Sequence, residues 1–273
     1  MLPDNATVAP APARAEASGR STRLATDNTR YSIRVADAAE VRAAQRLRHR
    51  VFAGELGATL HSPTEGLDID AFDAHCDHLV VVHDPTEEVV GTYRMLPPGR
   101  TPRLYSDGEF DLSALDGLRG GLVETGRSCV DPAHRDGAVI NLMWAGIARY
   151  LLLTGHRLLA GCASVPAADA DEVWAHIAER HLSAPGLRVT PLNPWPLSPA
   201  RANLKAVPPL LRGYLRLGAK VCGPPAYDPD FGVADFYIVL DLDDAHPRYL
   251  KHFLGEQGLG ERGPRALTPE RAA

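Results

Sequence analysis

Three charged residues stand in stretches of sequence that otherwise predict β-strands, where a charge needs a partner. Arg94 lies near the end of one such stretch, and Glu124 and Arg127 lie three residues apart in another. Residues three apart on a regular strand point to opposite faces, so these two share a site only if Gly126 supplies a bulge. The three side chains can simply neutralise one another, or they can bind a charged substrate and move its proton.

A run of aspartates precedes all three of these residues in the chain. Asp68, Asp70, Asp73 and Asp77 surround Phe72. The carboxylates of Asp70 and Asp73 can hold an ammonium group or tune the protonation of an amine, whereas the alternative is a solvated loop with an Asx turn. A calcium-binding EF-hand is disfavoured, because no glycine or closing glutamate follows at the required spacing.

A third candidate site lies between an expected strand and a long apolar helix. A glycine and several backbone N–H groups precede the first helical turn there, where they and the helix dipole favour a phosphate group. The segment contains Arg135, Gly137, Ala138 and Val139. It predicts a cradle for a pyrophosphate or a phosphopantetheine, and the alternative is an ordinary loop with a helix cap.

Covalent and metal-dependent chemistry has no support in the sequence. There is no Gly-x-Ser-x-Gly motif, and no Cys/His or Ser/His/Asp set stands out as a nucleophile with its base. The four cysteines lie far apart, without a Cys-x-x-Cys pair or a nearby His/Cys cluster at zinc-ligand spacing. We therefore expect no metal site, and reduced thiols in a cytosolic protein.

Composition restricts the class of protein further. The chain has 273 residues, of which 45% are hydrophobic and 23% charged, as in a globular protein of one large or two small domains. A net charge of −5 gives no general reason to bind nucleic acid. Apolar runs such as 79–82 and 151–153 are far shorter than the ~20 residues that span a bilayer. The first thirty residues lack the apolar segment of a secretory signal.

Hydrophobic periodicity predicts an alternation of strands and helices. Asp37 and Glu40 are spaced as a capping box at the start of the first helix. The expected strands are 31–35, 78–82, 89–96, 121–130, 157–162 and 235–242, and the expected helices are 37–54, 139–153, 169–181 and 209–217.

This order of elements indicates an α+β, or mixed α/β, fold. We expect a disordered N-terminal tail at 1–30, a single domain at 31–254 and a flexible tail at 255–273. The domain includes a C-terminal extension from about residue 185, whose Pro-rich first part is expected to be irregular.

Several linked motifs follow one another along the chain. They are Arg48-His49-Arg50-Val51-Phe52, Glu55-Leu56-Gly57, Asp70-Ala71-Phe72-Asp73, Asp77-His78-Leu79, Gly91-Thr92-Tyr93-Arg94, Glu124-Thr125-Gly126-Arg127, Pro208-Pro209-Leu210-Leu211, 213–219 and Asp230-Phe231-Gly232. Their order and spacing resemble the GNAT-fold N-acyltransferases that use acyl carrier protein. Within that group the sequence is most similar to the L-ornithine Nα-acyltransferases of ornithine-lipid synthesis, whose relatives are often labelled hemolysins. The resemblance covers about residues 31–253.

The resemblance implies a GNAT-type acyltransferase fold, in which a central mixed, twisted sheet has helices on both faces. It also implies transfer of a long-chain (3-hydroxy)acyl group from acyl carrier protein to the α-amine of L-ornithine, giving lyso-ornithine lipid. The neutral amine would attack the thioester carbonyl directly, with the oxyanion on a backbone N–H of the splayed central strand. The carrier-protein thioester is then a co-substrate, acyl-CoA is the alternative donor, and no cofactor is tightly bound.

Catalytic roles follow from matching these motif positions. The amine arrives protonated at neutral pH, so a base must remove its proton. Glu124 is the first candidate, and Asp70 and Asp73 are the next. Arg94 and Arg127 are expected to hold the carboxylate of the amino acid by bidentate pairing, while Asp70 and Asp73 meet its side-chain ammonium.

The remaining motif positions complete the expected binding sets. Arg48 and Phe52 join the substrate-binding residues. Arg135 and residues 137–139 are assigned to the phosphopantetheine of the acyl donor, as a degenerate form of the GNAT Arg/Gln-x-x-Gly-x-Gly/Ala loop. That degeneracy weakens the case for strict acetyl-CoA use.

Other functions on the same fold stay open. One is a CoA-dependent N-acetyltransferase, and another is an N-acyl amino acid or acyl-homoserine lactone synthase. The lactone synthases share the charged motif positions but usually carry Trp after Leu-Gly, where this chain has Ala58. A non-enzymatic hemolysin would need longer apolar segments than the sequence contains.

The expected partners are acyl carrier protein, the amino acid and, later in the pathway, a separate O-acyltransferase. Because carrier proteins are acidic, docking requires a local cationic face, for which Arg48, Arg50 and Arg135 are candidates.

Helix 209–217 offers two interpretations. Arg212 and Arg216 beside Leu211, Tyr214 and Leu215 predict either a peripheral contact with the inner face of the membrane or a helix packed on the core with snorkelling arginines. We expect a cytoplasmic protein, and peripheral contact with the membrane is the alternative location to test.

Overall fold

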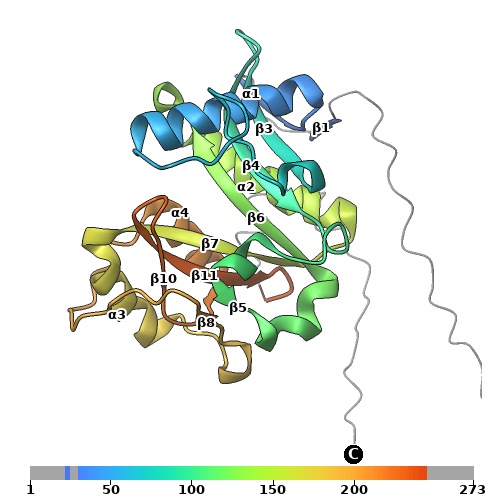
Figure 1. The fold of residues 1–273 in the computed structure, drawn as a ribbon. Coiled ribbons are helices and arrows are strands. Elements are labelled where there is room, and N and C mark those ends of the chain that lie inside the picture. The colour runs from blue at the N-terminus through green and yellow to red at the C-terminus, as the bar shows by residue number, and fades with distance from the viewer. Residues whose placement is uncertain (1–21, 25–29, 245–273) are drawn as a thin grey trace, which may run out of the picture.

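The fold is a mixed β-sheet with helices on both faces (Figure 1), seen in a computed structural model that describes residues 22–24 and 30–244. Within these residues, nine strands form one sheet in the order β1-β2-β3-β4-β6-β7-β11-β10, with β9 beside β11. Every pair is antiparallel except β6 and β7, which are parallel. The strands are β1 (Thr22–Leu24), β2 (Tyr31–Val35), β3 (Asp77–His83), β4 (Glu88–Leu96), β6 (Leu122–Val130), β7 (Leu158–Pro166), β9 (Lys220–Val221), β10 (Ala226–Asp228) and β11 (Val233–Asp241), and β5 (Phe110–Asp111) pairs separately with β8 (Thr190–Pro191).

Alternating apolar residues let the sheet bury both of its faces. Val80 and Val82 of β3 share a buried cluster with Leu47 of the first helix, whereas Leu79 and Val81 belong to the cluster on the opposite face. The first helix therefore covers one face, and the others contribute to the core on the other face. The helices are α1 (Ala38–His49), α2 (Ala138–Thr154), α3 (Ala170–Arg180) and α4 (Pro209–Leu217).

The capping box predicted for α1 is confirmed. The Asp37 carboxylate accepts the backbone N–H groups of Ala39 and Glu40 at 2.9 Å each, and the Glu40 carboxylate accepts that of Asp37 at 3.0 Å. The helix continues as a π-helical turn at Arg50–Glu55, which carries Phe52. Such turns occur often at functional sites.

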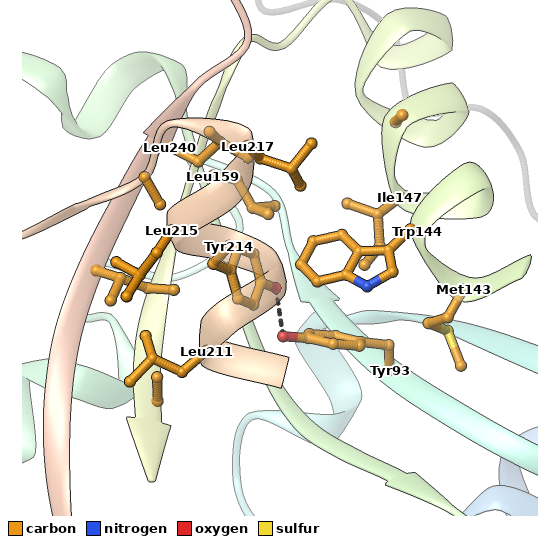
Figure 2. Close-up of a cluster of buried hydrophobic side chains, with 14 of the residues drawn as sticks. Tyr93, Met143, Trp144, Ile147, Leu159, Leu211, Tyr214, Leu215, Leu217 and Leu240 are labelled. Atoms are coloured by element: carbon orange, nitrogen blue, oxygen red, sulfur yellow. Dashed lines mark hydrogen bonds between the residues drawn. The ribbon is translucent and has the colours of Figure 1, made fainter. Parts of the chain in front are cut away.

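Helix α4 packs on the core, which confirms the second of the two interpretations of this helix. Leu211 and Tyr214 are 1% and 2% exposed. Figure 2 shows Tyr214 of α4 between Trp144 of α2 and Tyr93 of β4, and its hydroxyl lies 2.5 Å from that of Tyr93. Arg212 donates to the carbonyl groups of residues 204, 205 and 207. Among the described residues, no helix combines the length and hydrophobicity needed to cross a bilayer.

The structure departs from the predicted boundaries at two places. Thr22–Leu24 forms β1 against β2, so the expected tail at 1–30 is too long; an edge strand of three residues gives almost no periodic signal. The extension from residue 185 returns as β11, which lies inside the sheet between β7 and β10. Residues 1–21, 25–29 and 245–273, and with them the expected tail at 255–273, lie outside the described residues.

Candidate active site

A cavity of about 830 Å³ opens where the two parallel strands of the sheet diverge. β6 and β7 pair only at Leu122–Glu124 and Leu158–Ala160, and the following residues of both strands line the cavity. At the point of divergence, a Cβ on Gly161 would lie 2.2 Å from the carbonyl oxygen of Thr125. The two backbones can approach this closely only because residue 161 has no side chain.

A β-bulge in β6 directs Glu124 and Arg127 toward the same face. Thr92 of β4 pairs with Cys129 and Arg94 pairs with Gly126, so β6 carries one extra residue between these pairs. The bulge predicted from the sequence is therefore present, but the residue with positive φ is Arg127, at +52°, and not Gly126. The extra residue restores a shared face to two side chains that an ideal strand would separate.

Six charged side chains form a closed ring of ion pairs on the face of the sheet that carries α1. Three arginines alternate with three aspartates, and each carboxylate lies within 3.4 Å of two guanidinium groups, so that the formal charges cancel. In order around the ring they are Arg48, Asp68, Arg127, Asp70, Arg94 and Asp73.

Arg48 is the innermost member of the ring. Its side chain has 0% exposure, and its Nε and Nη2 atoms lie 2.8 Å from carboxylate oxygens of Asp68 and Asp73. Its expected part in a docking face is therefore wrong, because it has no exposed surface. It does not line the cavity either.

Asp70 and Asp73 are fully engaged by arginines. Burial acts to raise the pKa of Asp70, but the charge and hydrogen bond of Arg94 and the charge of Arg127 lower it to about 2. Asp73 accepts from Arg48, Arg94 and the backbone N–H of Asp70. A carboxylate with so low a pKa is a poor acceptor for the proton of an amine.

Arg94 and Arg127 reach the cavity wall between aromatic rings. The Arg127 guanidinium lies 4.9 Å from the ring centre of Tyr105 and 5.4 Å from that of Phe231, and its Nη1 donates to the Tyr105 hydroxyl at 3.3 Å. Arg94 lies 5.9 Å from the ring centre of Phe72. These contacts fix the orientation of both guanidinium groups.

Glu124 lines the cavity and, unlike Asp70 and Asp73, is bound by backbone N–H groups. Its two carboxylate oxygens accept the backbone N–H groups of Tyr105 at 2.6 Å and Ser106 at 2.9 Å, and the residue is 4% exposed. Burial raises the pKa of Glu124, although these hydrogen bonds act to lower it. Of the three carboxylates predicted to be catalytic, it is the one on the cavity wall.

The predicted donor loop lies away from this cavity. Arg135 forms a double hydrogen bond with Glu55, at 2.5 and 2.7 Å. Gly137 has a φ of +93° and precedes α2, which is the conformation that favours glycine, and the Ala138 N–H is capped by Asp136. The Val139 side chain is buried in the core.

The structure thus gathers some of the predicted residues and separates others. Phe52, Arg94, Glu124 and Arg127 share the cavity wall, whereas residues 135 and 137–139 do not line it. Arg50 and Arg135, expected to be free for docking, are paired with Asp131 and Glu55.

Three carboxylates on the cavity wall were not predicted. Glu109, Asp228 and Asp235 each offer an oxygen within 4.8 Å of the others. The sequence offered a signal for Asp235, because this charged residue interrupts the apolar pattern of the strand at 233–241. The other two lie in short elements whose proximity only the tertiary fold creates.

Comparison with known proteins agrees with this geometry. The Acetyltransferase (GNAT) domain model matches residues 47–145. The L-ornithine Nα-acyltransferase of Rhizobium meliloti is 36% identical over 81% of this chain and 83% of its own length, and that of Rhodobacter capsulatus is 36% identical over 77% and 90%. The fold is also similar to that of a solved structure of BjaI, a CoA-dependent acyl-homoserine lactone synthase, with SAM and isopentyl-CoA. The TM-score is 0.51 and the sequence identity 18%, and the match covers 79% of this chain and 81% of that one.

The predicted GNAT-type fold is confirmed by the sheet, the diverging strands and the matching domain model. The chain matches the two named relatives over most of their length as well as its own. This protein therefore belongs to the L-ornithine Nα-acyltransferase family.

Proposed function

We propose that this enzyme transfers a long-chain (3-hydroxy)acyl group from acyl carrier protein to the α-amine of L-ornithine, giving lyso-ornithine lipid. The observation that carries the proposal is the cavity at the divergence of β6 and β7, with Glu124 and Arg127 on its wall. The names of the curated relatives support the choice of amino acid.

The thioester of the donor would enter between the two diverging strands. Beyond Glu124, β6 is paired on its β4 side and, within the described residues, has no strand partner on its β7 side. Backbone N–H groups on such an edge can bind the oxyanion that develops on the carbonyl. The phosphate of the pantetheine arm is assigned to residues 135 and 137–139 at the start of α2, with Lys205 of the cavity wall as a further cation.

The chemistry then needs one base and no covalent intermediate. Glu124 takes a proton from the α-ammonium group, directly or through water, and the neutral amine attacks the thioester carbon. The C–N bond forms, the C–S bond breaks, and the pantetheine thiolate leaves and takes up the proton that the nitrogen loses as it becomes an amide. Glu124 suits this role better than Asp70 does, because burial raises its pKa whereas arginines hold the pKa of Asp70 at about 2.

The proposed setting is the cytoplasm. All four cysteines are free, which fits a reducing compartment. Acyl carrier protein is the proposed donor partner, and a separate O-acyltransferase would use the product, because the reaction leaves a free hydroxyl on a 3-hydroxyacyl chain.

The test is product analysis. The purified enzyme is incubated with 3-hydroxyacyl carrier protein and an equimolar mixture of ornithine, lysine, glutamine, glycine and S-adenosylmethionine, and products are identified by mass spectrometry. We expect N-acyl-ornithine. A different acylated amino acid would overturn the acceptor, and turnover of acetyl-CoA without any product from the carrier protein would overturn the donor.

A further inference from the structure

A cluster of three carboxylates lies on the wall of the acceptor cavity, apart from the ring of ion pairs. Glu109 follows the turn at Tyr105–Gly108, Asp228 ends β10, and Asp235 lies in β11. Within the described residues, no ion pair joins any of the three to an arginine or lysine, and the nearby Arg127 is paired with Asp68 and Asp70 instead. Among the described residues, the three carboxyl groups therefore face the cavity without an ion-pair partner.

Two oxygen atoms of the cluster lack hydrogen-bond partners. Asp235 is 3% exposed, and its Oδ1 is buried without a partner among the described residues; the same is true of Oε2 of Glu109. A buried acceptor without a donor is costly. Because both residues line the cavity, a molecule bound there can supply the missing donors.

The electrostatics of the cluster favour a cation as that molecule. Burial, together with the charge of Asp235, raises the pKa of Glu109 to about 8. Burial, with the charge of Asp228, raises the pKa of Asp235 to about 6. Glu109 therefore retains its proton near neutral pH, and a bound cation with N–H donors would lower its pKa and replace that proton.

The cluster is also connected to the proposed base. Ser106 donates its backbone N–H to Glu124 and places its hydroxyl 3.2 Å from the Cys162 thiol, and this thiol is hydrogen-bonded to Glu109. The two amino groups of ornithine are separated by four carbons, which is roughly 6 Å in an extended chain. Glu124 and the three carboxylates line the same cavity, so one molecule bound there would present one amine to Glu124 and the other to the cluster.

We propose that Glu109, Asp228 and Asp235 bind the side-chain ammonium of the acceptor amino acid, an inference that rests on the proposed function. It replaces the expectation that Asp70 and Asp73 do so, because those carboxylates are occupied by Arg48 and Arg94. An ammonium group supplies three N–H donors, which matches three carboxylates that converge on one point.

The experiment compares L-ornithine with L-norvaline, which has the same carbon chain without the side-chain amine. kcat/KM is measured for both acceptors with one acyl carrier protein donor, in wild type, Asp235→Asn and Glu109→Gln. The control is Glu179→Gln, whose carboxylate is exposed on α3. We expect the preference for ornithine to fall by about tenfold or more in both cluster variants, mainly through KM, and to stay unchanged in the control.

Asp228→Asn is the variant to use if the two buried substitutions prevent folding. Asp228 is half-buried at the end of the sheet, and asparagine keeps an acceptor for the N–H groups of Asp230 and Phe231.

An equal loss for both acceptors, or an unchanged preference, would overturn the ammonium site. A chelator should leave activity intact; loss that Mg²⁺ restores would identify a metal site instead. If wild type acylates neither amino acid, the proposed function itself fails, whereas acylation of ornithine with an unchanged preference sinks only this inference.

Discussion

The Oδ2 atom of Asp68 lies 2.8 Å from Nε of Arg48 and 3.3 Å from Nε of Arg127. One carboxylate thus joins an arginine with no exposed surface to an arginine on the cavity wall. The buried arginine of the ring thus helps to position an arginine that lines the cavity.

Replacing Arg48 should be far more damaging than replacing its exposed neighbour. Arg48→Ala leaves Asp68 and Asp73 without their shared partner in the interior, which should lower the free energy of unfolding by about 3–5 kcal/mol. Arg50→Ala removes an exposed pair with Asp131 and should cost under ~1 kcal/mol. Urea unfolding measures both. Equal costs would show that the ring does not stabilise the fold.

Replacing Glu124 should alter the dependence of rate on pH. Glu124→Gln should reduce kcat by about 10²–10⁴ near pH 7, because no base then deprotonates the amine. The deficit should shrink as the pH rises, because more of the acceptor is already neutral. Asp70→Asn should show no such recovery. If the Glu124→Gln profile runs parallel to that of wild type, Glu124 is not the base.

Two carboxylates should affect stability in opposite directions with pH. The pKa of Asp70 is lowered from 3.8 to about 2, so its contribution of about 2 kcal/mol is present above pH 4 and lost as the pH falls toward 2. The pKa of Glu109 is raised from 4.5 to about 8, so its contribution is present below pH 4.5 and lost as the pH rises through 8. The free energy of unfolding is measured with denaturant at a series of pH values. In Asp70→Asn it should no longer fall between pH 4 and 2, and in Glu109→Gln it should no longer fall as the pH rises toward 8. A Glu109→Gln curve with the wild-type decline would contradict this assignment.

The close approach of β6 and β7 at the point where they begin to diverge should depend on one missing side chain. Gly161→Ala would place a Cβ 2.2 Å from the Thr125 carbonyl oxygen, which forces the backbones of β6 and β7 apart. We expect a loss of stability of about 1–3 kcal/mol with reduced activity. Gly120→Ala, which meets nothing within 4 Å, serves as the control. Thermal unfolding and turnover that are the same for both variants would contradict the steric argument.

Local signals in the sequence predicted the parts of the fold that have strong periodicity or a cap. The Asp37 capping box and the strand at 122–130 are examples, since each depends on residues close together in the chain. Strands of two or three residues, such as β9 and β10, leave too short a pattern to detect.

The site was harder to predict, because it is assembled from distant segments. The motifs identified Glu124 and Arg127 as candidates. The burial of Arg48 depends on the packing of the segment with Asp68 and Asp73 against α1, and the convergence of Asp228 with Asp235 depends on the pairing of β10 with β11. The polar loop predicted to cradle phosphate has the expected glycine, yet lies outside the cavity, because sequence spacing cannot say which loop borders which pocket.

The extra residue in β6 makes that strand more sensitive to deletion than to substitution. Substitutions between Glu124 and Arg127 change one side chain at a time, whereas deleting a single residue there would leave the strand long enough to pair with β4 and yet turn Arg127 away from Asp68 and Asp70. A variant of this kind would lose two of the six ion pairs of the ring and the Arg127 guanidinium on the cavity wall. The number of residues between Glu124 and Arg127, and not only their identity, therefore sets the direction in which the Arg127 side chain points.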